Sequence, residues 1–143
     1  MKTKYIQMLQ KNIGGSMKGK IAGFGAWLDG RVSKISEAGD LEMEFVVREE
    51  MLNPMGNLHG GAVAAIIDEI LGFQLFLKSE EDSVYVSMTL NIDFLRAATA
   101  GDVITAIPQV VKSGRKIANV TCVLKNTVGK EIAQSTANFM RIV

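Results

Sequence analysis

The stretch from residue 53 to residue 78 carries the residue types that could do chemistry. A turn-rich loop leads through His59, Gly60 and Gly61 into a long apolar segment that is interrupted by Asp68. Nearly every residue from 62 to 77 is apolar, so we expect a helix that lies in the middle of the fold. A bare carboxylate is costly there unless it is paired, hydrogen-bonded or shifted in pKa. An acid retained under those conditions is a candidate for catalysis.

The step His59-Gly60-Gly61 opens the expected helix and could bind a carbonyl oxygen. The first backbone N–H groups of a helix have no partner inside it and carry the positive end of its dipole. Two glycines let a substrate oxygen approach these groups closely, which is the physics of an oxyanion hole. The alternative interpretation is that Asn57 or His59 caps the helix and that the glycines permit close packing.

Helical geometry limits what His59 and Asp68 can do together. They are nine residues apart, which places them about 13 Å apart along the helix axis and on opposite faces. Within one chain they cannot both touch one scissile carbonyl, so a site that uses both must combine two subunits. His59 is the only histidine, and the chain lacks the Gly-x-Ser-x-Gly frame of many serine hydrolases.

Other polar residues have a structural interpretation beside the functional one. Asp68 could be a structural acid that is hydrogen-bonded to a neighbouring strand, and Glu69 is more readily explained as structural or solvent-facing. Lys112, Arg115 and Lys116 stand in one turn, which either binds phosphate groups or is merely solvated.

Composition excludes several classes of function. The net charge of +1 over 143 residues argues against nucleic acid as the main partner. A single cysteine rules out an intrachain disulfide and fits a cytoplasmic location, and one histidine with one cysteine is too few for a typical zinc site. The N-terminus lacks the apolar core and cleavage site of a signal peptide. We also expect no membrane span, because the central helix should be too short, carries two acids and contains Gly72.

The rest of the chain predicts a sheet around this helix. Ile6, Leu9 and Ile13 recur at helical spacing before Gly14-Gly15, which indicates a short amphipathic helix over a sheet edge or a partner. Alternating and β-branched segments predict a hairpin before the central helix and four antiparallel strands after it, the last three as a meander. Long strands in one sheet leave unpaired edges, and dimerisation through an edge strand would cover them. The expected strands are 27–35, 41–47, 84–95, 103–111, 117–124 and 131–142.

The loop and helix resemble a known group of enzymes. The run Asn53-x-x-Gly56-x-Leu58-His59-Gly60-Gly61, with an acid nine residues after the histidine, is similar to the hotdog-fold acyl-CoA thioesterases of the phenylacetate-degradation (PaaI-like) group. Many relatives have proline where Ala97 stands here, and the first 26 residues match weakly. The similarity extends through residues 86–96, 100–102 and 129–133.

The resemblance implies an α+β hotdog fold, with one long central helix in a curved antiparallel sheet and a short N-terminal helix. Residues 1–143 would form one domain, with 1–26 as a helical extension, in homodimers that often pair into homotetramers. Asp68 matches the general base or nucleophile, and Gly60 the residue whose amide polarises the thioester carbonyl. His59 and Asn53 match residues beside that carbonyl, and Ser87 matches one that positions the water.

The resulting expectation is hydrolysis of acyl-CoA thioesters to free acid and CoA, without a metal or redox cofactor. Asp68 and Ser87 of one subunit would face Asn53 and Gly60 of the other. We expect CoA contacts at Gly61 and at the turn 112–116, whose cations would meet the phosphates. Two alternatives remain open: a hotdog-fold acyl dehydratase or hydratase, and a non-catalytic acyl-CoA-binding module.

Overall fold

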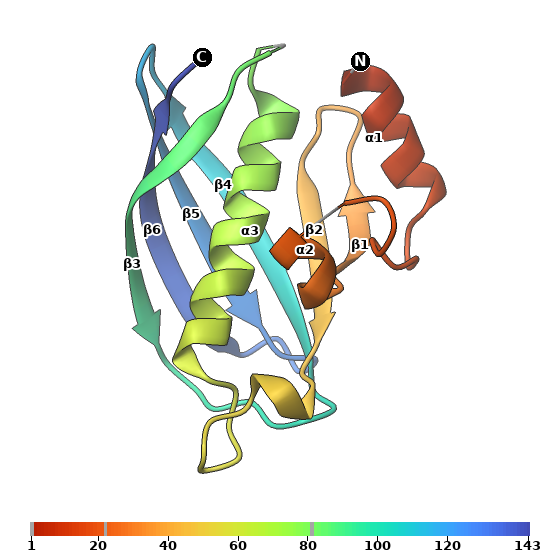
Figure 1. The fold of residues 1–143 in the computed structure, drawn as a ribbon, viewed down its shortest axis with the longest axis vertical. Coiled ribbons are helices and arrows are strands. Elements are labelled where there is room, and N and C mark those ends of the chain that lie inside the picture. Colours follow the sequence, from red (N-terminus) through yellow and green to blue (C-terminus); the bar gives the residue numbers. More distant parts are fainter. Residues whose placement is uncertain (1, 22, 81) are drawn as a thin grey trace.

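The computed structural model describes residues 2–21, 23–80 and 82–143, and it consists of one sheet and one long helix with smaller helices at the N-terminus (Figure 1). The elements in chain order are α1 (Lys2–Lys11), α2 (Gly23–Leu28), β1 (Arg31–Ile35), β2 (Leu41–Val46), the 3-10 turn η1 (Glu49–Met51), α3 (Gly60–Lys78), β3 (Tyr85–Phe94), β4 (Val103–Ser113), β5 (Ile117–Lys125) and β6 (Glu131–Arg141).

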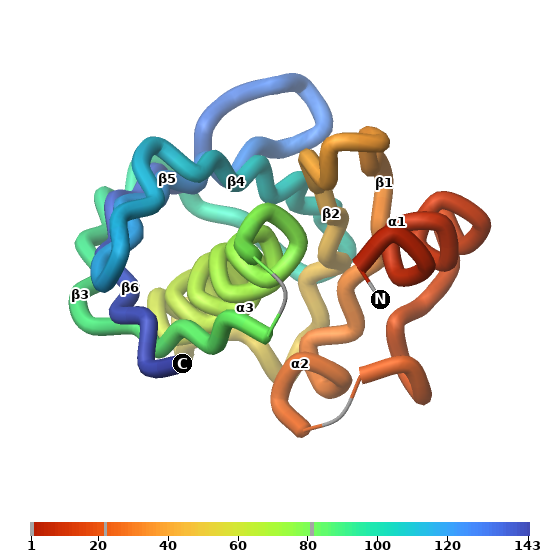
Figure 2. Tube along the Cα trace, turned by 90° about the horizontal axis from the view of Figure 1, so that it is seen from above, coloured from red at the N-terminus to blue at the C-terminus, as the bar shows by residue number. Residues whose placement is uncertain are grey.

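The six strands form one antiparallel sheet in the order β1-β2-β4-β5-β6-β3. Seen along α3, the sheet curls around this helix and leaves one side of it uncovered (Figure 2). The expected architecture of a curved antiparallel sheet around one long helix is therefore confirmed. The meander of β4, β5 and β6 is also confirmed, whereas β3 crosses to the far edge and pairs with β6, for example Leu90 with Ala137.

Helix α3 is buried along one face. Side chains such as Ile66, Ile70 and Leu75 have almost no exposed surface and pack against the concave side of the sheet. Each large aliphatic side chain that is buried in this way contributes roughly 1.5–3 kcal/mol. The opposite face, which includes Asp68 and Gly72, is only half-buried in the single chain. The expectation of a helix with little surface toward water is thus correct for one face.

Helix α3 is longer than the prediction against a membrane span assumed. Its nineteen residues are long and apolar enough to cross a membrane by length and composition alone, so the expectation that the helix is too short is wrong. The core helix of a water-soluble protein passes the same test, and the sheet accounts for the buried face of α3. Length and composition therefore do not by themselves indicate a membrane.

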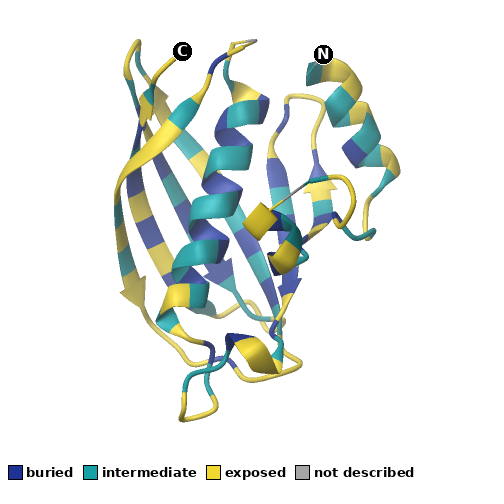
Figure 3. Ribbon diagram, viewed as in Figure 1, coloured by how far each residue is buried: buried dark blue, intermediate teal, exposed yellow. Residues whose placement is uncertain are grey.

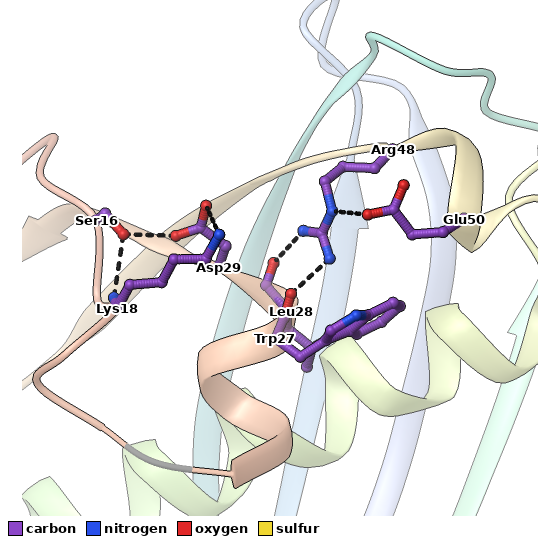
Figure 4. A network of polar contacts seen from close by, with 7 residues as sticks. All are labelled: Ser16, Lys18, Trp27, Leu28, Asp29, Arg48 and Glu50. Atoms are coloured by element: carbon purple, nitrogen blue, oxygen red, sulfur yellow. Dashed lines mark hydrogen bonds and ion pairs between the residues drawn. The ribbon is translucent and has the colours of Figure 1, made fainter.

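The N-terminal segment contains an unexpected helix. The expected strand 27–35 is wrong in its first part, because Trp27 belongs to α2 and the strand begins at Arg31. Arg48 holds the end of this helix: its guanidinium donates to the carbonyl oxygens of Trp27 at 2.5 Å and Leu28 at 3.2 Å (Figure 4). These are carbonyl groups that a helix end leaves without an internal partner. The same guanidinium lies 4.8 Å from the centroid of the Trp27 ring.

Helix α1 lies beside the sheet edge formed by β1, as expected (Figures 1 and 2). Leu9 is fully buried, whereas Ile13 lies beyond the helix and is exposed, so the expected apolar stripe ends one turn early. The other edge of the sheet is β3, which is exposed along most of its length (Figure 3). Met88 on this strand exposes 52% of its surface.

Candidate active site

The loop before α3 is held by Asn53. Its side-chain oxygen accepts hydrogen bonds from the amides of Met55 at 3.0 Å and Asn57 at 3.1 Å. Gly56 follows in a left-handed conformation with φ of 84°, which a residue with a side chain adopts at a cost. The Asn53 oxygen is therefore committed to the turn, and the amide nitrogen of the side chain is the group left to meet a ligand.

His59 is the N-cap of α3. Its Nδ1 accepts a hydrogen bond from the Gly61 amide at 2.8 Å, and its carbonyl oxygen accepts from Ala62 and Val63. The capping interpretation is thus confirmed for His59, and the Gly61 amide is engaged within the chain. Because Nδ1 accepts, the proton of the neutral ring lies on Nε2, and that N–H can donate to a ligand.

The Gly60 amide is the available donor at this end of the helix. The hydrogen bonds among the described residues leave it without an acceptor, as expected for a first helical residue. Gly60 lines a cavity of about 400 Å³ together with Leu58, Phe94 and Arg96. Helix geometry and an open cavity therefore give an oxygen atom access to this amide.

Asp68 lies with Ser87 at a second place. Both line a cavity of about 510 Å³ between α3 and β3, and both also line an adjoining cavity of about 410 Å³. The Oδ1 atom of Asp68 is buried and has no hydrogen-bond partner in the described part of the chain. The structural interpretation of Asp68 would require a hydrogen bond from a neighbouring strand, but no described strand residue donates to this oxygen. A buried acceptor without a partner is costly, so a ligand or a water molecule is the natural complement.

Glu69 is a second carboxylate in the larger cavity. Burial raises the pKa of Glu69, and the neighbouring Asp68 carboxylate raises it further. Glu69 was expected to be structural or solvent-facing, and in the structure it is half-buried beside the candidate acid. The sequence signal for a role of Glu69 was a second carboxylate next to Asp68 in an apolar helix. The direction of the Glu69 side chain depends on α2, a helix that the sequence pattern did not predict.

The single chain does not bring all of the predicted residues together. Asp68 and Ser87 share cavities in the middle of α3, while Gly60 and His59 lie at its beginning. The exposed turn with Lys112, at the start of its cationic run, lies at the end of the sheet where α3 ends (Figure 1). The predicted residues thus form three separate groups. The separation of His59 from Asp68 agrees with the distance of about 13 Å expected for nine residues of one helix.

An aromatic pair on α2 was not predicted. The rings of Phe24 and Trp27 stack with centroids 5.6 Å apart and planes at 10°. Both side chains are exposed, and both line a cavity of about 230 Å³ with His59 and Gly61. The pair adds an apolar surface beside the beginning of α3, and its sequence signal was confined to two aromatic residues three positions apart.

Comparison with known families decides what these groups belong to. The model of the thioesterase superfamily matches residues 55–133, a range that includes Gly60, Asp68 and Ser87. The chain belongs to the thioesterase superfamily. The resemblance to PaaI-like hotdog enzymes is thereby confirmed, and so is the expected enzyme class of a thioester hydrolase. Asn53 and the whole N-terminal segment lie outside the matched range.

Individual relatives agree with this family. Mouse acyl-coenzyme A thioesterase 13 is 34% identical over 117 residues, which cover 80% of this chain and 82% of the relative. A phenylacetic acid degradation-related protein from Ralstonia eutropha JMP134 is 28% identical and has a TM-score of 0.77, with 95% and 98% of the two chains covered. The PaaI protein of E. coli, at 20% identity, covers 100% of this chain and 97% of its own with a TM-score of 0.81, which confirms the hotdog fold.

Proposed function

We propose that this thioesterase hydrolyses acyl-CoA thioesters to a free acid and CoA. The buried Oδ1 of Asp68, which has no partner in the described chain and lies beside Ser87 in a cavity between α3 and β3, carries the proposal. Such an oxygen can accept a proton from a water molecule held near it. The name of the mouse relative and the acetyl-CoA bound to a neighbour of this fold from Streptococcus mutans support CoA as the carrier of the acyl group.

The proposed reaction uses two groups of atoms. Asp68 takes a proton from water, and the water oxygen attacks the thioester carbonyl carbon while the Gly60 amide donates to the developing oxyanion. Collapse of the intermediate breaks the C–S bond, and protonated Asp68 returns its proton to the CoA thiolate. In the alternative route, Asp68 attacks the carbonyl carbon directly, the C–S bond breaks and the CoA thiolate leaves. Water then hydrolyses the resulting mixed anhydride, which releases the free acid, restores the Asp68 carboxylate and supplies the proton that the thiolate takes up. Ser87 would position the water in either route.

A second copy of the chain completes the proposed site. Within one chain, Gly60 and Asp68 line different cavities. A homodimer in which β3 meets the partner would cover the exposed sheet edge and bring Asp68 of one subunit to Asn53, His59 and Gly60 of the other. We propose this homodimer, which can pair further into a homotetramer, as the active form in the cytoplasm.

The CoA moiety would contact charged groups outside the reaction centre. The cations of the turn 112–116 are exposed and offer an electrostatic contact for the CoA phosphates. The amide of Gly61 is engaged by His59, so its proposed part is to let the substrate approach closely. The reaction requires no metal or redox cofactor, because a carboxylate and a backbone amide suffice for the proton transfer and the oxyanion.

One observation speaks against the dehydratase alternative. In such an enzyme a histidine would act as a base, but Nδ1 of His59 is occupied by the Gly61 amide and Nε2 carries the ring proton. His59 in this arrangement donates a hydrogen bond and has no free lone pair for a substrate proton.

The test measures thiol release from a panel of acyl-CoAs. We expect Asp68→Asn to lower kcat by about 10²-fold or more, because the isosteric amide cannot take the proton. Gly60→Pro removes the amide N–H and adds a pyrrolidine ring at the first helical position, where proline is well tolerated, and we expect a loss of about 10²-fold or more. Gly60→Ala retains the N–H and is the matched control, with a milder effect from its contact with Phe94.

Three outcomes would contradict the proposal. Equal rates for wild type and Asp68→Asn would remove Asp68 from the mechanism. An enoyl product without thiol release would indicate a dehydratase. Tight binding of acyl-CoA without turnover across the panel would indicate a binding module.

A further inference from the structure

The cavity beside Asp68 continues along α3 toward the end of that helix. Asp68, Gly72 and Phe76 all line it, and their spacing of four residues places them on one face of the helix. From Asp68 to Phe76 this face extends about 12 Å. On the opposite wall, β3 contributes Ser87 and, two residues earlier, Tyr85. The 510 Å³ cavity thus begins among polar groups at the candidate acid and continues along the helix between Gly72 and the aromatic rings of Phe73 and Phe76.

Gly72 keeps this cavity open. A glycine inside a helix costs about 1 kcal/mol relative to alanine, so its place calls for a physical reason. Its backbone does not adopt a positive φ, and a Cβ built on it would meet no atom within 4 Å. By contrast, a Cβ on Gly25 would collide with the Glu69 carboxylate. Neither the backbone nor packing within the chain demands glycine at 72, whereas a large side chain there would extend into the cavity.

Tyr5 closes the far end of the cavity. Its ring stands edge-on against Phe73, with centroids 5.8 Å apart, and against Phe76, with centroids 5.5 Å apart. Tyr5 and Lys2 both belong to α1. Lys2 holds this helix at the end of α3, because its ammonium group donates to the carbonyl oxygens of Ser79 and Glu80. Burial also raises the pKa of the Tyr5 phenol. Helix α1 therefore forms the end wall of a cavity whose beginning is Asp68.

We propose that Gly72 and Tyr5 set the length of the acyl group that this enzyme accepts. An apolar acyl group would extend from its carbonyl at Asp68, pass the gap at Gly72 and end on the Tyr5 ring about two helical turns away. The inference rests on the proposed function, since it assigns the acyl group to the cavity beside Asp68. It also gives α1 a role, because this helix lies outside the range matched by the thioesterase superfamily.

The experiment compares the acyl-chain profile of wild type with variants of opposite effect. The profile is kcat/KM for straight-chain acyl-CoAs from acetyl to palmitoyl. Gly72→Leu narrows the cavity between Asp68 and Phe76, and we expect about tenfold or greater loss for the longest chain that wild type uses well, with acetyl-CoA little affected. Tyr5→Ala removes the end wall, and we expect about tenfold gain for chains longer than the wild-type optimum.

Controls separate length selection from stability and assembly. Tyr5→Phe keeps the ring and should keep the profile, as should Lys4→Ala at an exposed position of the same helix. Gly72→Ala should be at least as stable as wild type to urea and should keep the oligomeric state. If Gly72→Ala dissociates the protein, the glycine serves a subunit contact and the proposal for Gly72 is wrong.

Non-hydrolysable thioether analogues of the same lengths keep the test independent of turnover. Their Kd values, measured by calorimetry, should show the same opposite shifts in Gly72→Leu and Tyr5→Ala. Unchanged profiles in both variants would overturn the inference while wild-type thiol release still supported the proposed function. Shifted Kd profiles without any thiol release would overturn the proposed function and retain the length selection.

Discussion

Asp68 and Glu69 are adjacent acids with different surroundings. Asp68 has a buried oxygen that no described residue bonds, close to Ser87, whereas Glu69 is half-buried against Gly25 of α2. Burial and the Asp68 charge both raise the pKa of Glu69. Glu69 therefore binds its proton more tightly in the folded protein than in the unfolded chain.

We expect Glu69→Gln to remove part of the pH dependence of stability. Because the folded protein binds this proton more tightly than the unfolded chain, the stabilisation is complete below the ordinary glutamate pKa of 4.5 and is lost as the pH rises through the raised pKa. The free energy of unfolding of Glu69→Gln should therefore increase relative to that of wild type as the pH rises above 4.5. The difference between the two proteins should become constant above the raised pKa.

Urea unfolding of both proteins between about pH 4 and pH 8 measures this difference. Glu37→Gln removes one exposed carboxylate and controls for the change in net charge. A constant difference between Glu69→Gln and wild type across the whole range would show that burial of Glu69 does not favour its protonated form.

The main polar residues could be selected as candidates from the sequence, because each carries its own physical signal. An acid in an apolar helix marks Asp68, and a histidine before two glycines marks the beginning of that helix. The hydrogen bond from Gly61 to His59 could be anticipated only as one of two alternatives, because capping and substrate binding need the same residues. The orientation of Glu69 could not be predicted, since it depends on a helix formed by residues more than forty positions away.

At the level of elements, Gln74 joins α3 to the hairpin of β1 and β2. It exposes only 2% of its surface. Its Oε1 accepts from the Leu41 amide at 2.9 Å, and its Nε2 donates to the Gly39 carbonyl at 2.7 Å. Gly39 itself has a positive φ of 83°, as its place in the turn requires. One amide side chain thus satisfies two backbone groups where the hairpin meets the helix.

We expect Gln74→Leu to destabilise the fold although it makes α3 more apolar. The change leaves a buried amide at Leu41 and a carbonyl at Gly39 without partners, and each costs about 1–3 kcal/mol. The free energy of unfolding from urea titration should fall by about 2–5 kcal/mol. Gln109→Leu, at an exposed position of β4, is the matched control and should stay within about 0.5 kcal/mol of wild type. Equal stability of Gln74→Leu and wild type would contradict this role.

The ends of most strands were predictable because burial alternates along much of β2, β4, β5 and β6. Strand β6, for example, was expected over 131–142 and runs from Glu131 to Arg141. The six-residue helix α2 was missed because its last carbonyls are held by Arg48, about twenty positions later in the chain. The position of β3 beside β6 was also outside the pattern, since alternation does not identify the partner of a strand.

For the whole molecule, three features bear on assembly. Strand β3 is an exposed edge of ten residues, the half-buried Asp68 face of α3 lines a cavity beside that strand, and Gly60 lines a different cavity. An unpaired edge with exposed apolar side chains such as Met88 is a surface that proteins usually cover. A second copy would cover it and bring the two sets of polar groups together.

Mixing two inactive variants tests whether each site combines two chains. In a mixed dimer of Asp68→Asn and Gly60→Pro chains, one of the two sites would carry both changes, and the other would have Asp68 from one chain and the Gly60 amide from the other. Random pairing makes half of the dimers mixed, so we expect about a quarter of wild-type thioesterase activity after the separately purified variants are unfolded together and refolded.

The same refolding of each variant alone gives the background, and sedimentation velocity shows whether dimers form. If Asp68 and Gly60 of one chain served the same site, no combination of the two variants could restore it, and the mixture would show only the average of the two backgrounds. Each variant chain retains only one of the two groups, so recovery of activity requires the acid and the amide to come from different chains. We expect this result because the helical rise keeps the two groups about 12 Å apart within one chain.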